Sequence, residues 1–217
     1  MQITPEIHLV YGVRGANSYL VKIAAEKLLV VDTGLPGNAG RIVRYIGGLG
    51  QSPADVSHII LTHADIDHAG STAELKKATG ARVVIHAGDA PVLAGRRRFK
   101  SVGGPLGVLF GLVLPLLRFH PVDPDIIVED GFTLAGFRFI PTPGHTRGSL
   151  SLYRPGEVLF AGDAIYRRFA LDPAQARATW QRIAGLQFEI LLPGHGQPVV
   201  GAAAARLRAR LAHPGPG

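Results

Sequence analysis

The chain has 217 residues, 47% of them hydrophobic, which is enough for one substantial core and falls in the usual size range of a single domain. It contains no cysteine, which excludes disulfides, thiolate zinc sites and a cysteine nucleophile. Its formal net charge is +7, but the excess Lys and Arg residues lie in separate clusters and form no continuous basic stripe, so we expect no specific nucleic-acid partner.

Strands that alternate with helices are predicted for the first half of the chain. Apolar runs indicate strands near residues 7–11, 18–23, 28–31, 58–61 and 82–85, and helical patterns lie near 39–49 and 70–79. The segment that precedes the first strand, Met1–Glu6, has no basic and apolar signal pattern. We therefore expect a cytoplasmic location.

A dense polar cluster directly follows the apolar run Ile59–Leu61. His63, Asp65, Asp67 and His68 place four imidazole or carboxylate groups within six residues. A single such residue after a strand usually forms a turn, and the two aspartates are also suited to cap a helix that begins nearby. The alternative is a rigid strand end that holds a metal ion.

The most irregular segment of the chain lies near residues 91–121. It begins with basic residues and continues through an uncharged apolar run, Ser101–Leu117, that Gly and Pro interrupt. This run is shorter than the roughly 20 residues that a bilayer requires, so we expect no transmembrane span. Three interpretations stay open: a helical flap on the core, an apolar wall over the active site, or a surface that docks on a membrane or on a second subunit.

The second half repeats the pattern of strands followed by helices. Strands are expected near residues 132–134, 137–140, 150–153, 158–160 and 189–192, and helices near 173–185 and 200–211. The Gly- and Pro-rich end, 213–217, is typical of a frayed tail. Residues 1–217 are therefore expected to form one domain of two sheet-and-helix halves, with an apolar insertion near 91–121.

Three further candidate ligands each follow an apolar run and a turn. They are His145, Asp163 and His195, after Thr142–Gly144, Leu159–Gly162 and Leu191–Gly194. Taken singly, each would be a turn former. Taken with the first cluster, they make a set of seven groups that divalent ions of borderline or hard character accept. The set predicts a centre for two metal ions: His63, Asp65, Asp67, His68, His145, Asp163 and His195.

The order and spacing of these motifs resemble those of the metallo-β-lactamase superfamily. The segments that carry the resemblance are Asn17–Val21, Leu29–Gly34, Leu61–Gly70, Thr142–Thr146 and Pro193–Gly196. The resemblance implies a four-layer αββα sandwich. It also implies that one metal is held by His63, Asp65 and His145 and the other by Asp67, His68 and His195. Asp163 would bridge the two metals. Asp32 would not bind metal itself but would orient the ligands through hydrogen bonds.

Asp65 departs from the family motif, which usually has a second histidine at this point. Two divalent cations bring four positive charges, and Asp65, Asp67, Asp163 and a bridging hydroxide bring four negative ones, so the centre would be neutral. With histidine in place of Asp65 its charge would be +1. The extra carboxylate favours manganese or iron relative to zinc, the metal that the family most often implies.

The resemblance implies a hydrolase in which a metal-bound hydroxide attacks a carbonyl ester. Asp67, or alternatively Asp163, would accept a proton during the reaction, and we take Asp67 as the catalytic candidate. A lactone is the first expected substrate and a thioester of the glyoxalase II type the second, in either case a small molecule with an apolar tail. A phosphodiesterase or nuclease and a catalytically idle metal-binding module are the alternatives. Sequence motifs of phosphate loops, dinucleotide sites, serine hydrolases and HExxH proteases are absent from the sequence.

Tyr166 lies three residues after Asp163, in a segment that resembles the Asp-Ala-x-Tyr of acyl-homoserine lactone lactonases. The resemblance implies a phenol that faces the substrate carbonyl, and the alternative is a packed wall residue. The remaining histidines complete no motif, and we expect structural roles for them: His8, His58, His86, His120 and His213.

Overall fold

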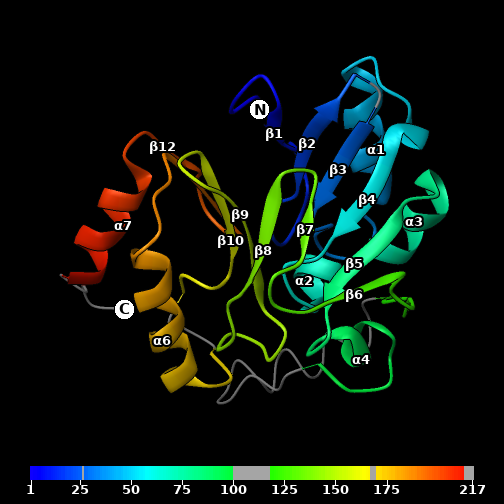
Figure 1. Cartoon of the computed structure of the whole chain (residues 1–217). Coiled ribbons are helices and arrows are strands. Elements are labelled where there is room, and N and C mark those ends of the chain that lie inside the picture. Colours follow the sequence, from blue (N-terminus) through cyan, green and yellow to red (C-terminus); the bar gives the residue numbers. More distant parts are fainter. Residues whose placement is uncertain (26, 100–117, 167–169, 213–217) are drawn as a thin grey trace.

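The computed structural model describes residues 1–25, 27–99, 118–166 and 170–212. Its strands form two sheets of six (Figure 1). The first sheet has the order β1 (Ile7–Leu9), β2 (Tyr19–Ala24), β3 (Lys27–Val31), β4 (Val56–Ile60), β5 (Arg82–His86) and β6 (Ile126–Val128). The second has the order β12 (Val199–Val200), β11 (Ile190–Pro193), β10 (Val158–Gly162), β9 (Leu150–Arg154), β8 (Phe137–Pro141) and β7 (Thr133–Leu134).

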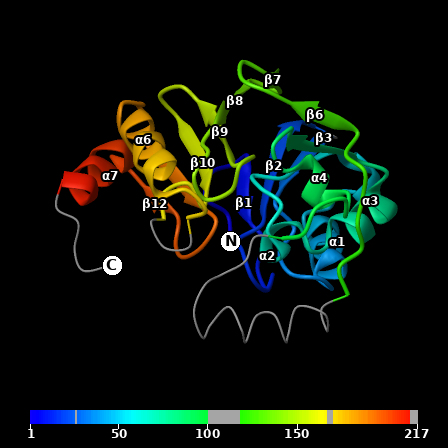
Figure 2. The same ribbon diagram turned by 90° about the horizontal axis from the view of Figure 1, so that it is seen from below.

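Helices cover the outer face of each sheet (Figure 2). In chain order they are α1 (Ala39–Gly48), α2 (Ile66–Ala69), α3 (Thr72–Thr79), α4 (Ala90–Leu93), α6 (Pro173–Ala184) and α7 (Ala203–Ala212), with a 3₁₀ turn, η1, at Pro53–Asp55. Helices α1 and α3 lie beside the first sheet, and α6 and α7 beside the second. The layers therefore follow the predicted order of helix, sheet, sheet and helix.

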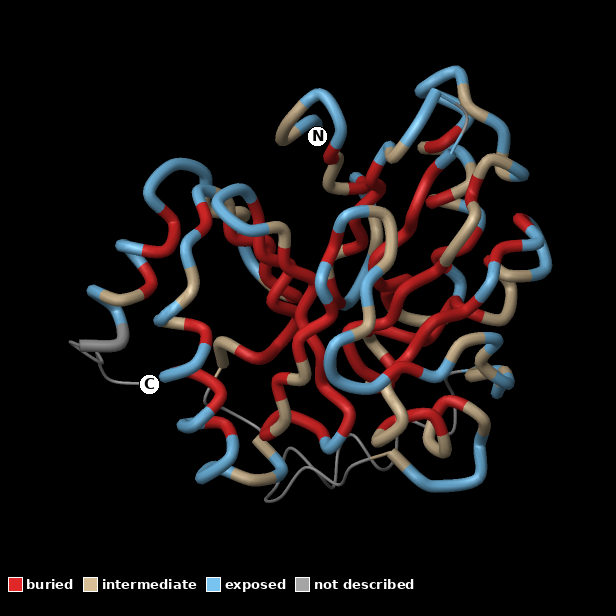
Figure 3. Tube along the Cα trace, viewed as in Figure 1, coloured by how far each residue is buried: buried red, intermediate tan, exposed pale blue. Residues whose placement is uncertain are grey.

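The central strands of both sheets consist mostly of buried residues (Figure 3), and side-chain alternation along these strands explains this burial. On β3, Leu28 and Val30 pack toward the outer helices, whereas Leu29 and Val31 pack between the two sheets. On β10, Phe160 packs between the sheets and Leu159 packs toward α6 and α7. Because successive side chains of a strand point to opposite faces, continuous apolar runs fill two layers of core at once.

The strand directions bring the predicted ligands to one edge. Strands β3, β4, β5 and β6 are parallel, and β10 is parallel to β11. Strand β9 is antiparallel to both β8 and β10, so β8, β10 and β11 end at the same side of the second sheet. A backbone hydrogen bond of 2.8 Å from Leu150 N to Thr62 O joins this edge to the end of β4. The carboxyl ends of both sheets therefore meet.

The predicted strands and helices are observed, with boundary shifts and some additional elements. The predicted helix at 70–79 is preceded by the separate short helix α2, and the helix expected from residue 200 begins at Ala203, after strand β12. Five short elements had no prediction: η1, α2, α4, β6 and β12. Within the described ranges, no helix combines the length and apolar character needed to cross a bilayer.

The two flanks of the segment near 91–121 lie side by side. The rings of Phe99 and Phe119 meet edge to face with centroids 4.9 Å apart, and Val122 N donates to Leu93 O at 3.1 Å. The apolar run itself, 100–117, lies outside the described residues, as do 167–169 and 213–217. The three interpretations of that run therefore stay open.

Candidate metal centre

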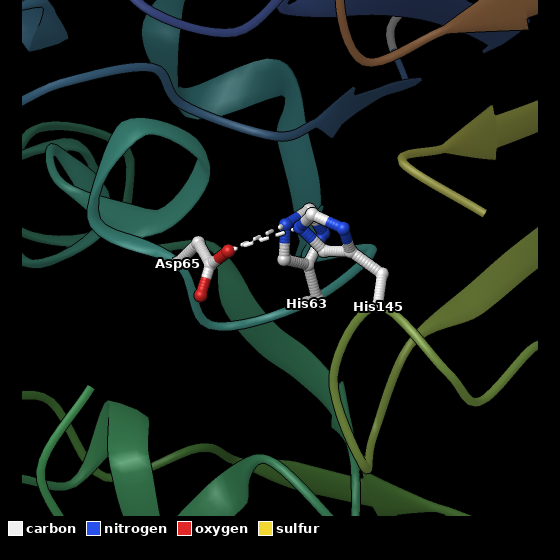
Figure 4. A group of neighbouring side chains, drawn as sticks. All are labelled: His63, Asp65 and His145. Atoms are coloured by element: carbon white, nitrogen blue, oxygen red, sulfur yellow. Dashed lines mark hydrogen bonds and ion pairs between the residues drawn. The ribbon is translucent and has the colours of Figure 1, made fainter. Parts of the chain in front are cut away.

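The first predicted ligand triad comes together from three separate backbone positions. His63 and Asp65 follow β4, and His145 follows β8. The Asp65 Oδ2 atom lies 3.5 Å from His63 Nε2 and 3.1 Å from His145 Nε2 (Figure 4). One ligand atom of each residue falls within 4.8 Å of the others. This spacing suits a shared metal ion.

The second predicted triad forms beside the first. Asp67 and His68 lie on α2, and His195 follows β11. His195 Nε2 lies 3.3 Å from Asp67 Oδ2 and 3.3 Å from His68 Nε2. Asp65 occupies the N-cap position of α2, yet its side chain makes no capping hydrogen bond. The capping alternative for Asp65 therefore has no support, because this carboxylate is directed to the histidines instead.

Asp163 connects the two triads. Its Oδ2 atom lies 3.4 Å from His145 Nε2 and 3.4 Å from His195 Nε2, and its Oδ1 atom lies 3.4 Å from His68 Nε2. The seven residues predicted as ligands are thus one continuous cluster, with Asp163 where the bridging ligand was expected.

Buried polar atoms at the centre of the cluster fit a cation. His63 Nε2 and Asp163 Oδ1 are buried and accept or donate no hydrogen bond within the described part of the chain. A buried polar atom without a partner costs free energy. Both atoms face other imidazole and carboxylate groups at 3.4–3.5 Å. Divalent ions would satisfy them, so the residues present fit the metal centre that the resemblance implied.

Asp32 fixes the orientation of two histidines, in agreement with its predicted role. Its Oδ2 atom lies 2.9 Å from His68 Nδ1 and accepts from Thr62 Oγ1 at 2.8 Å, and its Oδ1 atom accepts from Thr62 N at 2.8 Å. Because Thr62 Oγ1 donates to Asp32, it is free to accept from His63 Nδ1 at 3.0 Å. With an ion bound, both histidines would carry their proton on Nδ1 and direct the Nε2 lone pair to the centre.

The conformation of Asp32 shows how firmly it is held. Its φ angle is 59°, in the left-handed region that residues other than glycine rarely adopt. Such a conformation costs on the order of 1 kcal/mol or more, and its hydrogen bonds to Thr62 and His68 offset that cost. The strained backbone of Asp32 therefore lies next to the proposed ligands His63 and His68, on the side away from the metal centre.

Glycine is required at Gly194, between β11 and His195. A Cβ atom at this position would overlap Asp163 Oδ1 and would lie 2.6 Å from His68 Cε1. Any larger residue would therefore displace the carboxylate that connects the two triads. This explains the Pro-Gly-His pattern physically: the chain must pass against the centre before it presents His195.

The carboxylates and imidazoles of the cluster shift one another's pKa values. Hydrogen bonds to Asp163 and Asp67 raise the pKa of His195 to about 9. Burial lowers the pKa of His68, but the carboxylates of Asp163 and Asp32 outweigh burial and raise it well above its usual value. Burial raises the pKa of Asp163, and the surrounding imidazoles reverse this and hold it far below its usual range. Protons thus balance the carboxylates where divalent ions would otherwise do so.

Asp89 is a functional candidate that the sequence did not reveal. It follows β5 and is 3% exposed. Its Oδ2 atom accepts from Ala64 N at 3.0 Å and from Thr146 Oγ1 at 2.7 Å, and its Oδ1 atom accepts from Gly148 N at 2.8 Å. Asp89 therefore joins the loop after His63 to the loop after His145. No motif marks it, because it contributes no ligand atom.

Replacement of Asp89 by asparagine is expected to weaken metal binding at the first triad by about tenfold to a hundredfold, because the amide nitrogen cannot accept the hydrogen bonds that the carboxylate accepts. Competition with a chromogenic chelator measures this affinity. Asp123→Asn is the matched control, since the Asp123 side chain is 73% exposed and pairs only with Arg96 among the described residues. A lower melting temperature with unchanged metal affinity would limit Asp89 to a role in stability.

The tyrosine predicted to face the substrate lies at the edge of the cluster. The Tyr166 hydroxyl donates to the backbone carbonyl of His195, and burial, with Asp163 nearby, raises its pKa to about 12. The phenol therefore stays protonated at neutral pH. Among the histidines expected to be structural, His8, His58, His86 and His120 lie outside the cluster, and His213 lies outside the described residues.

Comparison with known proteins identifies the family. The model of the metallo-beta-lactamase superfamily matches residues 11–195. The chain belongs to this superfamily. A probable metallo-hydrolase of Bacillus subtilis, YflN, is 30% identical over an alignment that covers 86% of this chain and 82% of that relative. A solved metallo-beta-lactamase of Cronobacter sakazakii, a mutant of its HARLDQ motif, is 27% identical, with a TM-score of 0.75 over 97% of this chain and 92% of that one.

A further group of relatives carries a more specific name. A hydroxyacylglutathione hydrolase of Rhodobacter capsulatus is 33% identical and aligns with 59% of this chain, but the alignment spans only 43% of that relative. Homologues of the same name from two other bacteria are 28% and 29% identical. The superfamily fold predicted from the motifs is therefore confirmed, and these names bear on the substrate only as a proposal.

Proposed function

We propose that this superfamily member is a metal-dependent hydrolase that cleaves a carbonyl ester at a centre for two metal ions. The observation that carries the proposal is the position of Asp163, whose Oδ2 atom lies 3.4 Å from one histidine of each triad. A carboxylate so placed suits a bridging ligand between two ions. The name of the relative YflN, a probable metallo-hydrolase, agrees with this activity.

Each triad would hold one ion. His63, Asp65 and His145 would hold the first, and Asp67, His68 and His195 the second. Divalent ions in such a centre supply a nucleophile at neutral pH and polarise a carbonyl group. Zinc is the metal expected from the family, whereas the carboxylate of Asp65 favours manganese or iron.

Asp67 is suited to accept a proton during cleavage. Its side chain is 34% exposed, so solvent and small molecules can reach it. Burial raises its pKa, but the hydrogen bond to His195 and the nearby His68 and His63 give a net lowering. Asp67 is therefore ionised at neutral pH and available as a base.

A thioester is the substrate class that the combined observations favour, with a lactone as the second candidate. Relatives named hydroxyacylglutathione hydrolase support the thioester. The argument for a lactone depended on Tyr166, and the hydroxyl of this residue already donates to the carbonyl of His195. That bond must break or rotate before the phenol can donate to a substrate.

Replacement of Tyr166 by phenylalanine is expected to lower kcat by about tenfold to a thousandfold, because one hydrogen-bond donor to the developing oxyanion is lost. Steady-state kinetics on a lactone and on a thioester, together with metal analysis of the variant, separate two roles. A lower kcat with two ions retained indicates contact with substrate. Loss of the second ion instead indicates that the phenol positions the His195 loop, and unchanged kcat and metal content would remove Tyr166 from the site.

A panel of substrates tests the proposed activity. Wild-type protein is assayed with a thioester, a lactone and a bis-phosphodiester, first with a strong chelator and then with added zinc, manganese or iron. We expect thioester turnover that disappears with the chelator and returns with metal. Turnover of the phosphodiester alone would favour the nuclease, and metal binding without any turnover would favour the idle metal-binding module.

The apolar substrate tail and the homodimer contact were predicted from the apolar run of the sequence. This run lies within 100–117, outside the described residues. Both stay predictions, as do the cytoplasmic location and the single domain of residues 1–217.

A further inference from the structure

A cavity of about 390 Å³ opens beside the first ligand triad. Asp65 lines its inner side, and Val92 and Leu171 add apolar surface. This volume is within the range of pockets that bind small molecules, roughly 300–1,000 Å³. A substrate placed with its carbonyl at the triad would therefore extend naturally into this space.

Three arginines give the cavity a positive wall. Arg97 and Arg98 follow α4, and Arg147 lies two residues after His145. All three are exposed, and none forms an ion pair with a carboxylate of the described residues. The guanidinium groups come from two segments that are distant in sequence, so their convergence on one cavity is a property of the fold.

The described carboxylates that line the same cavity form no ion pair with these arginines. Asp65 is turned to His63 and His145, and the buried Asp89 accepts hydrogen bonds from Ala64, Thr146 and Gly148. The proposed metal centre is neutral when Asp65 is counted, so it adds little net attraction for an anion. Among the described residues that line this cavity, attraction for an anion therefore comes from the arginines.

Arg147 also borders a second cavity of about 590 Å³, which it shares with Thr146 and Leu171. The carboxylate in that lining, Asp172, is occupied at the start of α6, where its Oδ1 atom accepts from the backbone N–H groups of Ala174 and Gln175. Arg147 thus borders two cavities, and it forms no ion pair with a carboxylate in the part of the chain that the structure describes.

We propose that the substrate ester carries a carboxylate or phosphate group, which Arg97, Arg98 and Arg147 bind in the cavity beside Asp65. This inference rests on the proposed hydrolase function and specifies its substrate class. A guanidinium group presents a planar fork of donors that matches a carboxylate or a phosphate. Neutral lactones and simple neutral thioesters would lack this contact, so they should be poorer substrates.

Three thioesters with the same acetyl group test the proposal. S-acetyl-N-acetylcysteamine is neutral, S-acetylglutathione carries carboxylates, and acetyl-coenzyme A carries phosphates. In wild-type protein we expect kcat/KM to be at least about tenfold higher for one anionic thioester than for the neutral one, with most of the difference in KM. The anionic thioester with the larger increase in kcat/KM identifies whether the site prefers a carboxylate or a phosphate. Added salt should lower kcat/KM for the anionic thioesters only.

Variants locate the effect at the arginines. Arg147→Gln, and Arg97→Gln combined with Arg98→Gln, should each lower the ratio of anionic to neutral kcat/KM by about tenfold while the neutral thioester is unaffected. Arg44→Gln, on α1 and outside the cavity, is the matched control for loss of one positive charge. Calorimetric binding of S-methylglutathione, which cannot be hydrolysed, or of the corresponding coenzyme A thioether should weaken in the same variants.

The outcomes separate failure of this inference from failure of the proposed function. If wild-type protein hydrolyses no thioester or lactone under any metal condition, the proposed function fails. If it hydrolyses neutral and anionic thioesters equally well, or if the arginine variants leave the ratio and the thioether affinity unchanged, only the anion site is overturned. Equal losses on all three thioesters would also overturn it, because they would show a structural effect.

Discussion

Replacement of Asp163 by alanine is expected to release metal and to lower hydrolysis by roughly a thousandfold or more. Its carboxylate is the group that reaches both triads, at 3.4 Å from His145 and His195 through Oδ2 and 3.4 Å from His68 through Oδ1. Without it, the two triads lose their common ligand. Elemental analysis of the purified variant and its turnover of the best thioester measure the two effects together.

The matched control for this variant is Asp123→Ala. Asp123 is exposed and pairs with Arg96 on the surface at 2.6 Å, so its loss removes a carboxylate without touching the centre. We expect normal metal content and turnover in this control. Full activity and unchanged metal content in Asp163→Ala would contradict the role assigned to Asp163, and His145→Ala provides an independent check on the first triad.

Replacement of Asp65 by histidine is expected to retain metal but to shift its preference toward zinc over manganese by roughly tenfold to a hundredfold. The change replaces a hard carboxylate with an imidazole and leaves the centre with a charge of +1 instead of zero. Space for the larger ring exists, because Asp65 lines the cavity of about 390 Å³. Competition between zinc and manganese for the metal-free protein measures the ratio of affinities.

Two controls belong to this experiment. Wild-type protein sets the reference ratio under the same conditions, and Asp65→Asn removes the charge without adding a nitrogen ligand. We expect Asp65→Asn to lose affinity for both ions. An identical zinc-to-manganese ratio in wild type and Asp65→His would show that the charge at this position does not govern metal choice.

The sequence indicated which seven side chains come together, because each lies at or shortly after the end of a buried strand. Apolar runs before His63, His145, Asp163 and His195 mark strands whose ends are rigid, and a rigid strand end fixes where the next side chain goes. The parallel relation of β10 and β11, and of β3 through β5, then brings these ends to one edge. The resemblance to the superfamily also implied the role of Asp32, which directly follows β3.

The role of Asp89, the short edge strands β6 and β12 and the arginines of the cavity could not be predicted from the sequence alone. Asp89 contributes no metal ligand, and its importance depends on contacts with Ala64, Thr146 and Gly148, which lie 25 to 59 residues away. Strands β6 and β12 have three and two residues, too few to show a period of two. The basic wall of the cavity combines arginines from two distant segments, so no local pattern could predict it.

Titration of metal-free protein with a divalent ion tests the binuclear centre most directly. Turnover of the best thioester and the bound metal per chain are measured at each step, with free metal kept low by a chelating buffer. We predict no turnover without metal and a rise that reaches its maximum at two ions per chain, as expected if Asp163 joins two occupied triads. Full turnover by metal-free protein, or a maximum at one ion per chain, would contradict this centre.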